Sequence, residues 1–157
     1  MTAVVAICGP GNARPAEVEA AAFVARRLAE AGATIVCGGL GGVMDAAARG
    51  AREAGGTVVG ILPGPTREGA SPHLSVALPT GMGEARNALV ARAADVLVAI
   101  GGGPGTLSEI AFALKLGTPV VGLDTWQLAK EGAPLGTIER AVTPEDAVRL
   151  ALRALRR

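Results

Sequence analysis

The sequence contains few aromatic residues and little net charge, and both shortages argue against a nucleic-acid partner. The aromatic residues are Phe23, Phe112 and Trp126, with no tyrosine, so a platform for stacking single-stranded bases is not expected. The 15 basic and 14 acidic residues leave a net charge of +1, which provides no basic field to attract nucleic acid. We therefore expect no nucleic-acid partner.

Cysteine, histidine and lysine are also scarce, which excludes several kinds of site. Two cysteines, Cys8 and Cys37, cannot form a disulfide framework or a four-ligand zinc site. The single histidine, His73, argues against a histidine-based metal site and against a Ser-His-Asp triad. Neither lysine, Lys115 or Lys130, follows a glycine-rich loop as the P-loop lysine does. No metal site and no ATP hydrolysis are expected.

Long hydrophobic runs are missing as well. No apolar run approaches the roughly 20 residues of a membrane span, and no basic residue precedes Arg14, so no signal peptide is predicted. We expect a cytoplasmic protein that has no membrane partner. Half of the 157 residues are hydrophobic and 18% are charged, which excludes a disordered chain. The length predicts a single domain over residues 1–157.

Short apolar segments alternate with segments of helical periodicity. The apolar segments are nearly continuous rather than alternating, as in strands that are buried on both faces. This order predicts a doubly wound, Rossmann-like α/β fold, a parallel sheet with helices on both faces. The predicted strands are 3–8, 34–37, 57–62, 75–78, 95–100 and, as the last, 118–123. The predicted helices are 16–31, 43–54, 82–94, 106–116 and 144–156, the last capped by Thr143. Residues 125–141 are expected to be irregular.

Glycine is abundant, with 23 residues, and it follows three of the predicted strands just before a helix. Amides at a helix N-terminus favour anions, and glycine lets the backbone approach a phosphate closely. Three such loops at one edge of a sheet predict a phosphate-binding site. The dinucleotide fingerprint is incomplete, because Arg14 stands where it has glycine or alanine and Gly38 ends the strand where an acid is expected. The loop glycines are Gly9, Gly11, Gly38, Gly39, Gly41, Gly42, Gly101, Gly102, Gly103 and Gly105.

Three motifs carry a resemblance to a known family. The segment 102–109, GGPGTLSE, resembles the PGGxGTxxE motif of the LOG family, long misnamed lysine decarboxylase. The segment 38–44, GGLGGVM, is similar to that family's GGGxxGLM segment, and Glu84-Ala85-Arg86-Asn87 to its arginine-containing segment. The resemblance extends over roughly residues 4–121. Because LOG proteins release the base from a nucleoside 5′-monophosphate, it implies a phosphoribohydrolase with Arg86 and Glu109 in the catalytic positions.

Two departures from the LOG motifs resemble a second group. Gly101 replaces a proline and Asn87 replaces a lysine, as in molybdenum cofactor carrier proteins, which share the fold and bind a phosphorylated pterin. The resemblance therefore leaves open a hydrolase, a non-catalytic carrier and a nucleotide sensor. The implied ligand is an AMP-like nucleotide or a molybdopterin-type cofactor, and no further cofactor is required. The loop glycines, Met44, Asn87 and Thr106 are the expected binding residues.

Several of these residues also have a purely structural interpretation. Thr106 and Glu109 have the spacing of a capping box, with Thr106 as N-cap. Arg86 lies near the start of a predicted helix, where a cation opposes the helix dipole; it binds either a ligand phosphate or a carboxylate such as Glu84. Met44 is expected to pack against the sheet. The alanine-rich helices 18–31 and 88–94 predict, as the resemblance does, a homo-oligomer, either a dimer or a tetramer built from two dimers.

Overall fold

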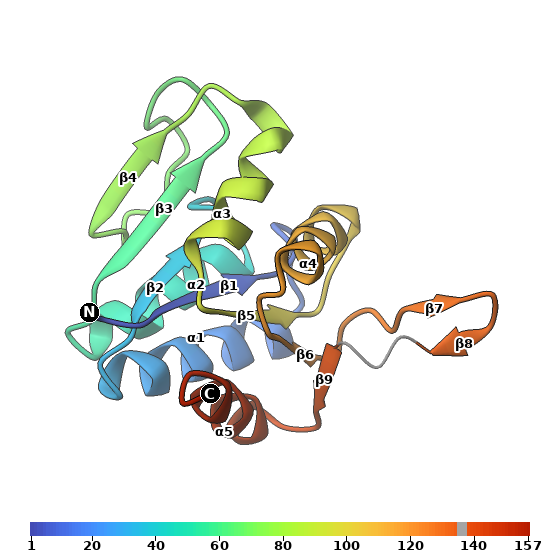
Figure 1. Ribbon diagram of the computed structural model, residues 1–157. Helices are drawn as coiled ribbons and strands as arrows, with labels where there is room; N and C mark the ends of the chain where they lie inside the picture. The colour runs from blue at the N-terminus through green and yellow to red at the C-terminus, as the bar shows by residue number, and fades with distance from the viewer. Residues whose placement is uncertain (135–137) are drawn as a thin grey trace.

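The computed structural model describes residues 1–134 and 138–157 (Figure 1). Seven strands form one sheet in the order β4-β3-β2-β1-β5-β6-β9, and every neighbouring pair is parallel. The predicted doubly wound α/β fold is thereby confirmed. The strands are β1 (Val4–Cys8), β2 (Thr34–Cys37), β3 (Val58–Leu62), β4 (Val76–Pro79), β5 (Val96–Ile100), β6 (Val120–Leu123) and β9 (Ile138–Ala141).

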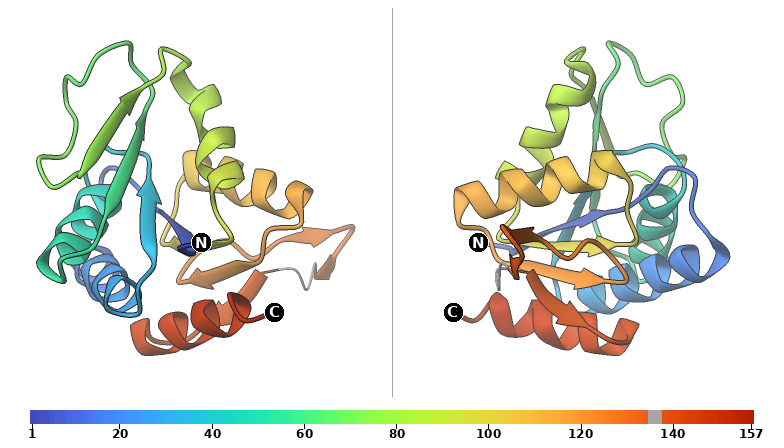
Figure 2. Two further views of the ribbon diagram at one scale, coloured as in Figure 1. Left: turned by 60° about the vertical axis from the view of Figure 1, so that its left-hand side comes forward. Right: turned by 90° about the vertical axis from the view of Figure 1, so that its right-hand side faces the viewer.

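Helices cover both faces of the sheet (Figure 2). One face packs against α1, α2 and α5, and the other against α3 and α4. A short 3₁₀ helix, η1, leads directly into α3, so the predicted helix over 82–94 is two elements. The helices are α1 (Pro15–Glu30), α2 (Val43–Glu53), η1 (Gly83–Arg86), α3 (Asn87–Ala93), α4 (Pro104–Leu116) and α5 (Pro144–Ala154).

Strand β1 shows how alternation divides the core between the two faces. Val5 and Ile7 belong to the apolar cluster under α1, α2 and α5. Ala6 and Cys8 belong to the cluster under α3 and α4. Because successive side chains of a strand point to opposite faces, both sets are apolar, and the strand reads as one continuous apolar run.

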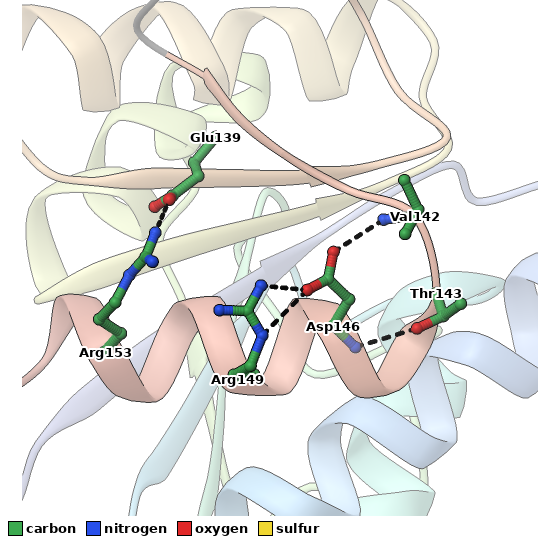
Figure 3. A network of polar contacts seen from close by, with 6 residues as sticks. All are labelled: Glu139, Val142, Thr143, Asp146, Arg149 and Arg153. Atoms are coloured by element: carbon green, nitrogen blue, oxygen red, sulfur yellow. Dashed lines mark hydrogen bonds and ion pairs between the residues drawn. The ribbon is translucent and has the colours of Figure 1, made fainter.

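Helix α5 begins as the sequence predicts, with an N-cap threonine and a proline at the first helical position (Figure 3). The Thr143 hydroxyl accepts a hydrogen bond of 3.1 Å from the amide of Asp146. The Asp146 carboxylate accepts one of 3.1 Å from the amide of Val142 and pairs with Arg149. Arg153 pairs with Glu139 of β9, which ties the helix to the edge of the sheet.

The segment 125–141 differs from its prediction, since its described residues contain three short strands. It contains the antiparallel pair β7 (Ala129–Lys130) and β8 (Ala133–Pro134), which projects from the sheet in Figure 1, and the edge strand β9. The expectation that 118–123 is the last strand is therefore wrong. Strand β9 has a weak sequence signal because Glu139 and Arg140 interrupt its four residues. Residues 135–137 of this segment lie outside the described residues.

Two further findings concern surfaces. None of the helices in the described part of the chain is long and apolar enough to span a bilayer. Most of the alanines in α1 are buried within the chain, against α2 and the sheet, and Val18 and Phe23 of this helix are half-buried. Exposed apolar side chains lie instead on β4 and α3, at Val76, Leu78 and Leu89. The oligomeric state stays a prediction.

Candidate functional site

The three glycine loops meet at one edge of the sheet, as the sequence predicts. They follow β1, β2 and β5, which are neighbours in the strand order. From β1 the chain winds outward through β2, β3 and β4, then crosses back and continues through β5, β6 and β9. The direction therefore reverses between β1 and β5. Ligands of doubly wound sheets bind beyond the carboxyl ends of the strands at this point.

A pocket of about 250 Å³ lies at this reversal. It is formed by the loop after β1, the first turns of α2 and α4, and η1 with the first residue of α3. Both predicted catalytic residues contribute to it. Its lining residues are Gly9, Pro10, Gly11, Met44, Glu84, Arg86, Asn87, Gly103, Pro104, Gly105, Thr106 and Glu109.

The N-terminus of α4 opens into this pocket. Gly103 is the N-cap and Pro104 the first helical residue. The first hydrogen bond within the helix is donated by the amide of Leu107 to the carbonyl of Gly103, at 3.1 Å. The amides of Gly105 and Thr106 precede Leu107, so they have no carbonyl of the helix to bind. Free amides and the helix dipole together favour an anion at this end.

The capping-box interpretation of Thr106 and Glu109 is wrong. Helix α4 begins two residues earlier than predicted, because Pro104 fits the first helical position, where no amide donor is needed. Thr106 is therefore the third helical residue, and Glu109 lies in the second turn. No side chain caps this helix, so capping does not explain Glu109.

Arg86 supplies a buried positive charge to the pocket. It ends η1, is 6% exposed, and its Nε has no hydrogen-bond partner among the described residues. The predicted salt bridge to Glu84 is absent from the ion pairs of the described residues, and none of them includes Arg86. A buried charge is costly unless it is paired. The guanidinium is therefore a candidate partner for an anion.

Glu109 reaches the pocket from α4 and is also 6% exposed. Burial raises the pKa of its carboxyl from 4.5 to about 7, while a hydrogen bond with the Cys8 thiol and the charge of Arg86 act in the opposite direction. Burial, with the charge of Glu109, raises the pKa of the Cys8 thiol well above its ordinary value. At neutral pH the pocket thus combines a cation with a carboxyl that is close to the midpoint of its titration, and the Cys8 thiol beside that carboxyl is neutral.

The predicted glycines divide into two groups. Four line the pocket: Gly9, Gly11, Gly103 and Gly105. The other six are not among its lining residues: Gly38, Gly39, Gly41, Gly42, Gly101 and Gly102. Gly38 is the most informative, because a Cβ at this position would lie 2.0 Å from Nη1 of Arg86 and 2.6 Å from Sδ of Met44. The missing side chain of Gly38 is what makes room for the buried guanidinium.

Asn87 and Met44 complete the wall of the pocket. The Asn87 side-chain amide donates a 2.9 Å hydrogen bond to the Ser108 hydroxyl, which donates to the Gly105 carbonyl at 2.6 Å. Asn87 therefore joins η1 and α3 to the first turn of α4 and fixes the distance between the two sources of positive potential. Met44 lies beside Gly11 and Gly38, so it both packs and lines the pocket.

A second pocket, of about 540 Å³, lies at the carboxyl end of β6. Its lining includes Trp126, Gln127 and Arg140. The Trp126 indole donates a 3.2 Å hydrogen bond to the Gly103 carbonyl, so the two pockets are neighbours across this residue. The sequence gives no sign that Trp126 returns to the α4 loop, so this second pocket was not predicted.

Sequence reasoning also missed Glu84, which lines the pocket, and Cys8, which lies outside the lining but influences the pKa of Glu109. The alternation of β1 places Cys8 on the α4 face of the sheet, which was the available signal. Glu84 is exposed and lines the rim of the pocket. His73 is not among the lining residues of this pocket. No group of three or more metal-ligating side chains was found among the described residues.

Comparisons with known proteins agree with this geometry. The structure of a molybdenum cofactor binding protein from the phototrophic bacterium Rippkaea orientalis matches with a TM-score of 0.89 at 30% identity, covering 100% of this chain and 99% of that one. The molybdenum cofactor carrier protein of Chlamydomonas reinhardtii also matches with a TM-score of 0.89, at 32% identity and with all of both chains covered. An uncharacterized protein of Archaeoglobus fulgidus is 38% identical over 144 residues, 92% of this chain and 91% of its own.

The predicted resemblance to LOG-like and molybdenum cofactor carrier-like proteins is confirmed by these matches. The profile of the SLOG cluster4 family matches residues 2–148, which include every strand of the sheet and both pockets. This chain belongs to the SLOG cluster4 family.

Proposed function

We propose that this protein binds a phosphorylated pterin of the molybdenum cofactor type and carries it without chemical change. The observation that carries the proposal is Arg86, a cation that is 94% buried, unpaired among the described residues and directed to the same pocket as the α4 N-terminus. A phosphate placed there would accept hydrogen bonds from the guanidinium and from the free amides, and charge-assisted bonds of this kind are the strong ones.

The neighbouring pocket supports a ligand with a planar ring as well as a phosphate. Trp126 presents an aromatic surface between the two pockets, and Gln127 and Arg140 provide polar groups around the larger one. A flat heterocycle with several donors and acceptors, such as a pterin, suits a site of this composition. The names of the two solved relatives, a cofactor binding protein and a cofactor carrier protein, favour the same ligand class.

The experiment is a binding titration with a phosphorylated pterin on the wild type and on Arg86→Met. Methionine fills much of the same volume without the charge, so we expect affinity to fall at least tenfold. The thermal midpoint should be no lower than that of the wild type, because a buried charge is removed. Arg92→Ala is the matched control, since Arg92 is exposed on α3 and absent from the pocket lining. Equal affinity in wild type and Arg86→Met would contradict the proposal.

A second candidate function, hydrolysis of a nucleoside 5′-monophosphate, is favoured by Glu109 alone. A carboxyl with a pKa of about 7 in a phosphate pocket has the properties of a general base for water. This function requires base release that increases with pH as the carboxyl ionises and that Glu109→Gln abolishes. The carrier function requires no base release from any nucleoside monophosphate.

A further inference from the structure

The binding pocket contains a conflict of charge that the carrier proposal does not resolve. Glu109 and Arg86 are both 6% exposed and line the same pocket from different elements, yet no ion pair joins them among the described residues. A phosphate held by Arg86 and the α4 amides would bring its negative charge into a small pocket that already holds a carboxyl. An ionised carboxylate would repel it, and burial leaves little water to screen the repulsion.

Hydrogen-bond chemistry adds to this conflict. The oxygens of a phosphate dianion only accept hydrogen bonds, and an ionised carboxylate only accepts them as well. A protonated carboxyl, in contrast, has one O–H to donate. Only the neutral form of Glu109 therefore makes a favourable contact with such a ligand.

We propose that Glu109 binds the anionic ligand as a protonated hydrogen-bond donor, so that an anion that binds to the ionised site brings one proton with it. This inference rests on the proposed function, because it specifies how the same pocket selects a fully ionised phosphate. Glu109 is then a residue that determines affinity and specificity.

The groups that face Glu109 are compatible with protonation near neutral pH. Burial raises the pKa of the thiols of Cys8 on β1 and Cys37 on β2, which keeps both neutral. Among the described residues, Arg86 of η1 is the cation that acts on the carboxyl, and Glu84 of η1 is an exposed anion at the rim. Burial is the largest influence on the carboxyl and raises its pKa to about 7. A bound anion would raise that pKa further, because it adds negative charge beside the carboxyl.

The test uses sulfate as the probe, because its charge is constant over the range studied. Isotope-labelled protein is titrated with sulfate between pH 5.5 and 8.5 in the presence of a chelator, and the amide signals of Gly105 and Thr106 are followed. We expect the dissociation constant to be nearly constant below about pH 6 and to rise about tenfold per pH unit above pH 7. Calorimetry at pH 8 in buffers of different ionisation enthalpy should show an uptake of close to one proton.

Glu109→Gln provides the matched variant, since its amide donates like the neutral acid and does not titrate. Its dissociation constant should be independent of pH and within about threefold of the wild-type value at pH 6. Glu84→Gln, which removes the exposed carboxylate of the same pocket, should keep the pH dependence.

Three results would overturn the inference. The first is a wild-type dissociation constant that does not change with pH. The second is a folded Glu109→Gln variant that binds sulfate more than tenfold more weakly than the wild type at pH 6. The third is sulfate binding that requires a divalent cation to bridge the carboxylate and the sulfate. The wild-type titration decides the question even if the variant does not fold. Failure of the proposed function is distinguishable, because Gly105 and Thr106 would then not respond to a phosphorylated pterin at any pH, whatever their response to sulfate.

Discussion

Replacing Glu109 by glutamine should stabilise the protein at alkaline pH. In the unfolded chain the Glu109 carboxyl ionises near its ordinary pKa of 4.5, whereas burial in the folded protein raises that pKa to about 7. Between these two values the folded state holds a proton that the unfolded state has lost. The free energy of unfolding of the wild type therefore falls as pH rises through this window and levels off above it.

The structure sets the size of this effect. A pKa of about 7 instead of 4.5 corresponds to about 3 kcal/mol, at about 1.4 kcal/mol for each tenfold change in proton affinity. Little of this is lost to solvent screening, because only 6% of Glu109 is exposed. A domain has a total stability of about 5–15 kcal/mol, so the change is large enough to measure. Glutamine does not titrate, and its stability should lack this component of the pH dependence.

The assay is urea denaturation of wild type and Glu109→Gln at several pH values from 4 to 8. The variant should match the wild type near pH 4 and exceed it by about 3 kcal/mol at pH 8. Glu84→Gln serves as control, because Glu84 is exposed at the rim of the same pocket and its removal should leave the pH dependence almost unchanged. If the two curves of wild type and Glu109→Gln stay parallel to within about 1 kcal/mol, burial does not perturb this carboxyl and the reasoning fails.

Three further predictions concern the pockets and the assembly. Gly38→Ala should displace the Arg86 guanidinium, whose Nη1 is 2.0 Å from the added Cβ, and weaken phosphate binding at least tenfold in a titration. Gly41→Ala is the control, because the nearest atom to a Cβ at Gly41 is 3.7 Å away. Equal affinity of the two variants would contradict the role given to Gly38. Trp126→Ala should weaken binding of a phosphorylated pterin by about 1–3 kcal/mol through lost stacking but leave sulfate affinity unchanged, and an equal loss for both ligands would argue against a ring site beside Trp126. Light scattering should give two or four times the monomer mass, and replacing the exposed Leu78 of β4 by aspartate should lower that mass; a monomer at all working concentrations would refute the oligomer.

The sequence by itself determined the architecture and the edge of the sheet at which the ligand site lies. Continuous apolar strands such as Val96–Ile100 are stable only when both faces of the sheet are covered. Because strands alternate with helices along the chain, a parallel sheet with helices on both faces is the expected arrangement. The glycine loops after β1, β2 and β5 were therefore certain to meet once those strands became neighbours. Arg86 and Glu109 were identified through the motifs that contain them, and the structure brings both to one pocket.

The tertiary structure alone decided what these residues do there. The three-residue spacing of Thr106 and Glu109 predicted a capping box, and this prediction is wrong because α4 begins at Pro104. Arg86 has no hydrogen-bond partner at Nε among the described residues, which only the packed structure reveals. Gly38 makes room for Arg86, and Cys8 influences the pKa of Glu109; in both pairs the residues are distant in sequence. Burial and pairing depend on every element packed around a group, so a raised pKa or an unpaired charge has no local signature in the chain.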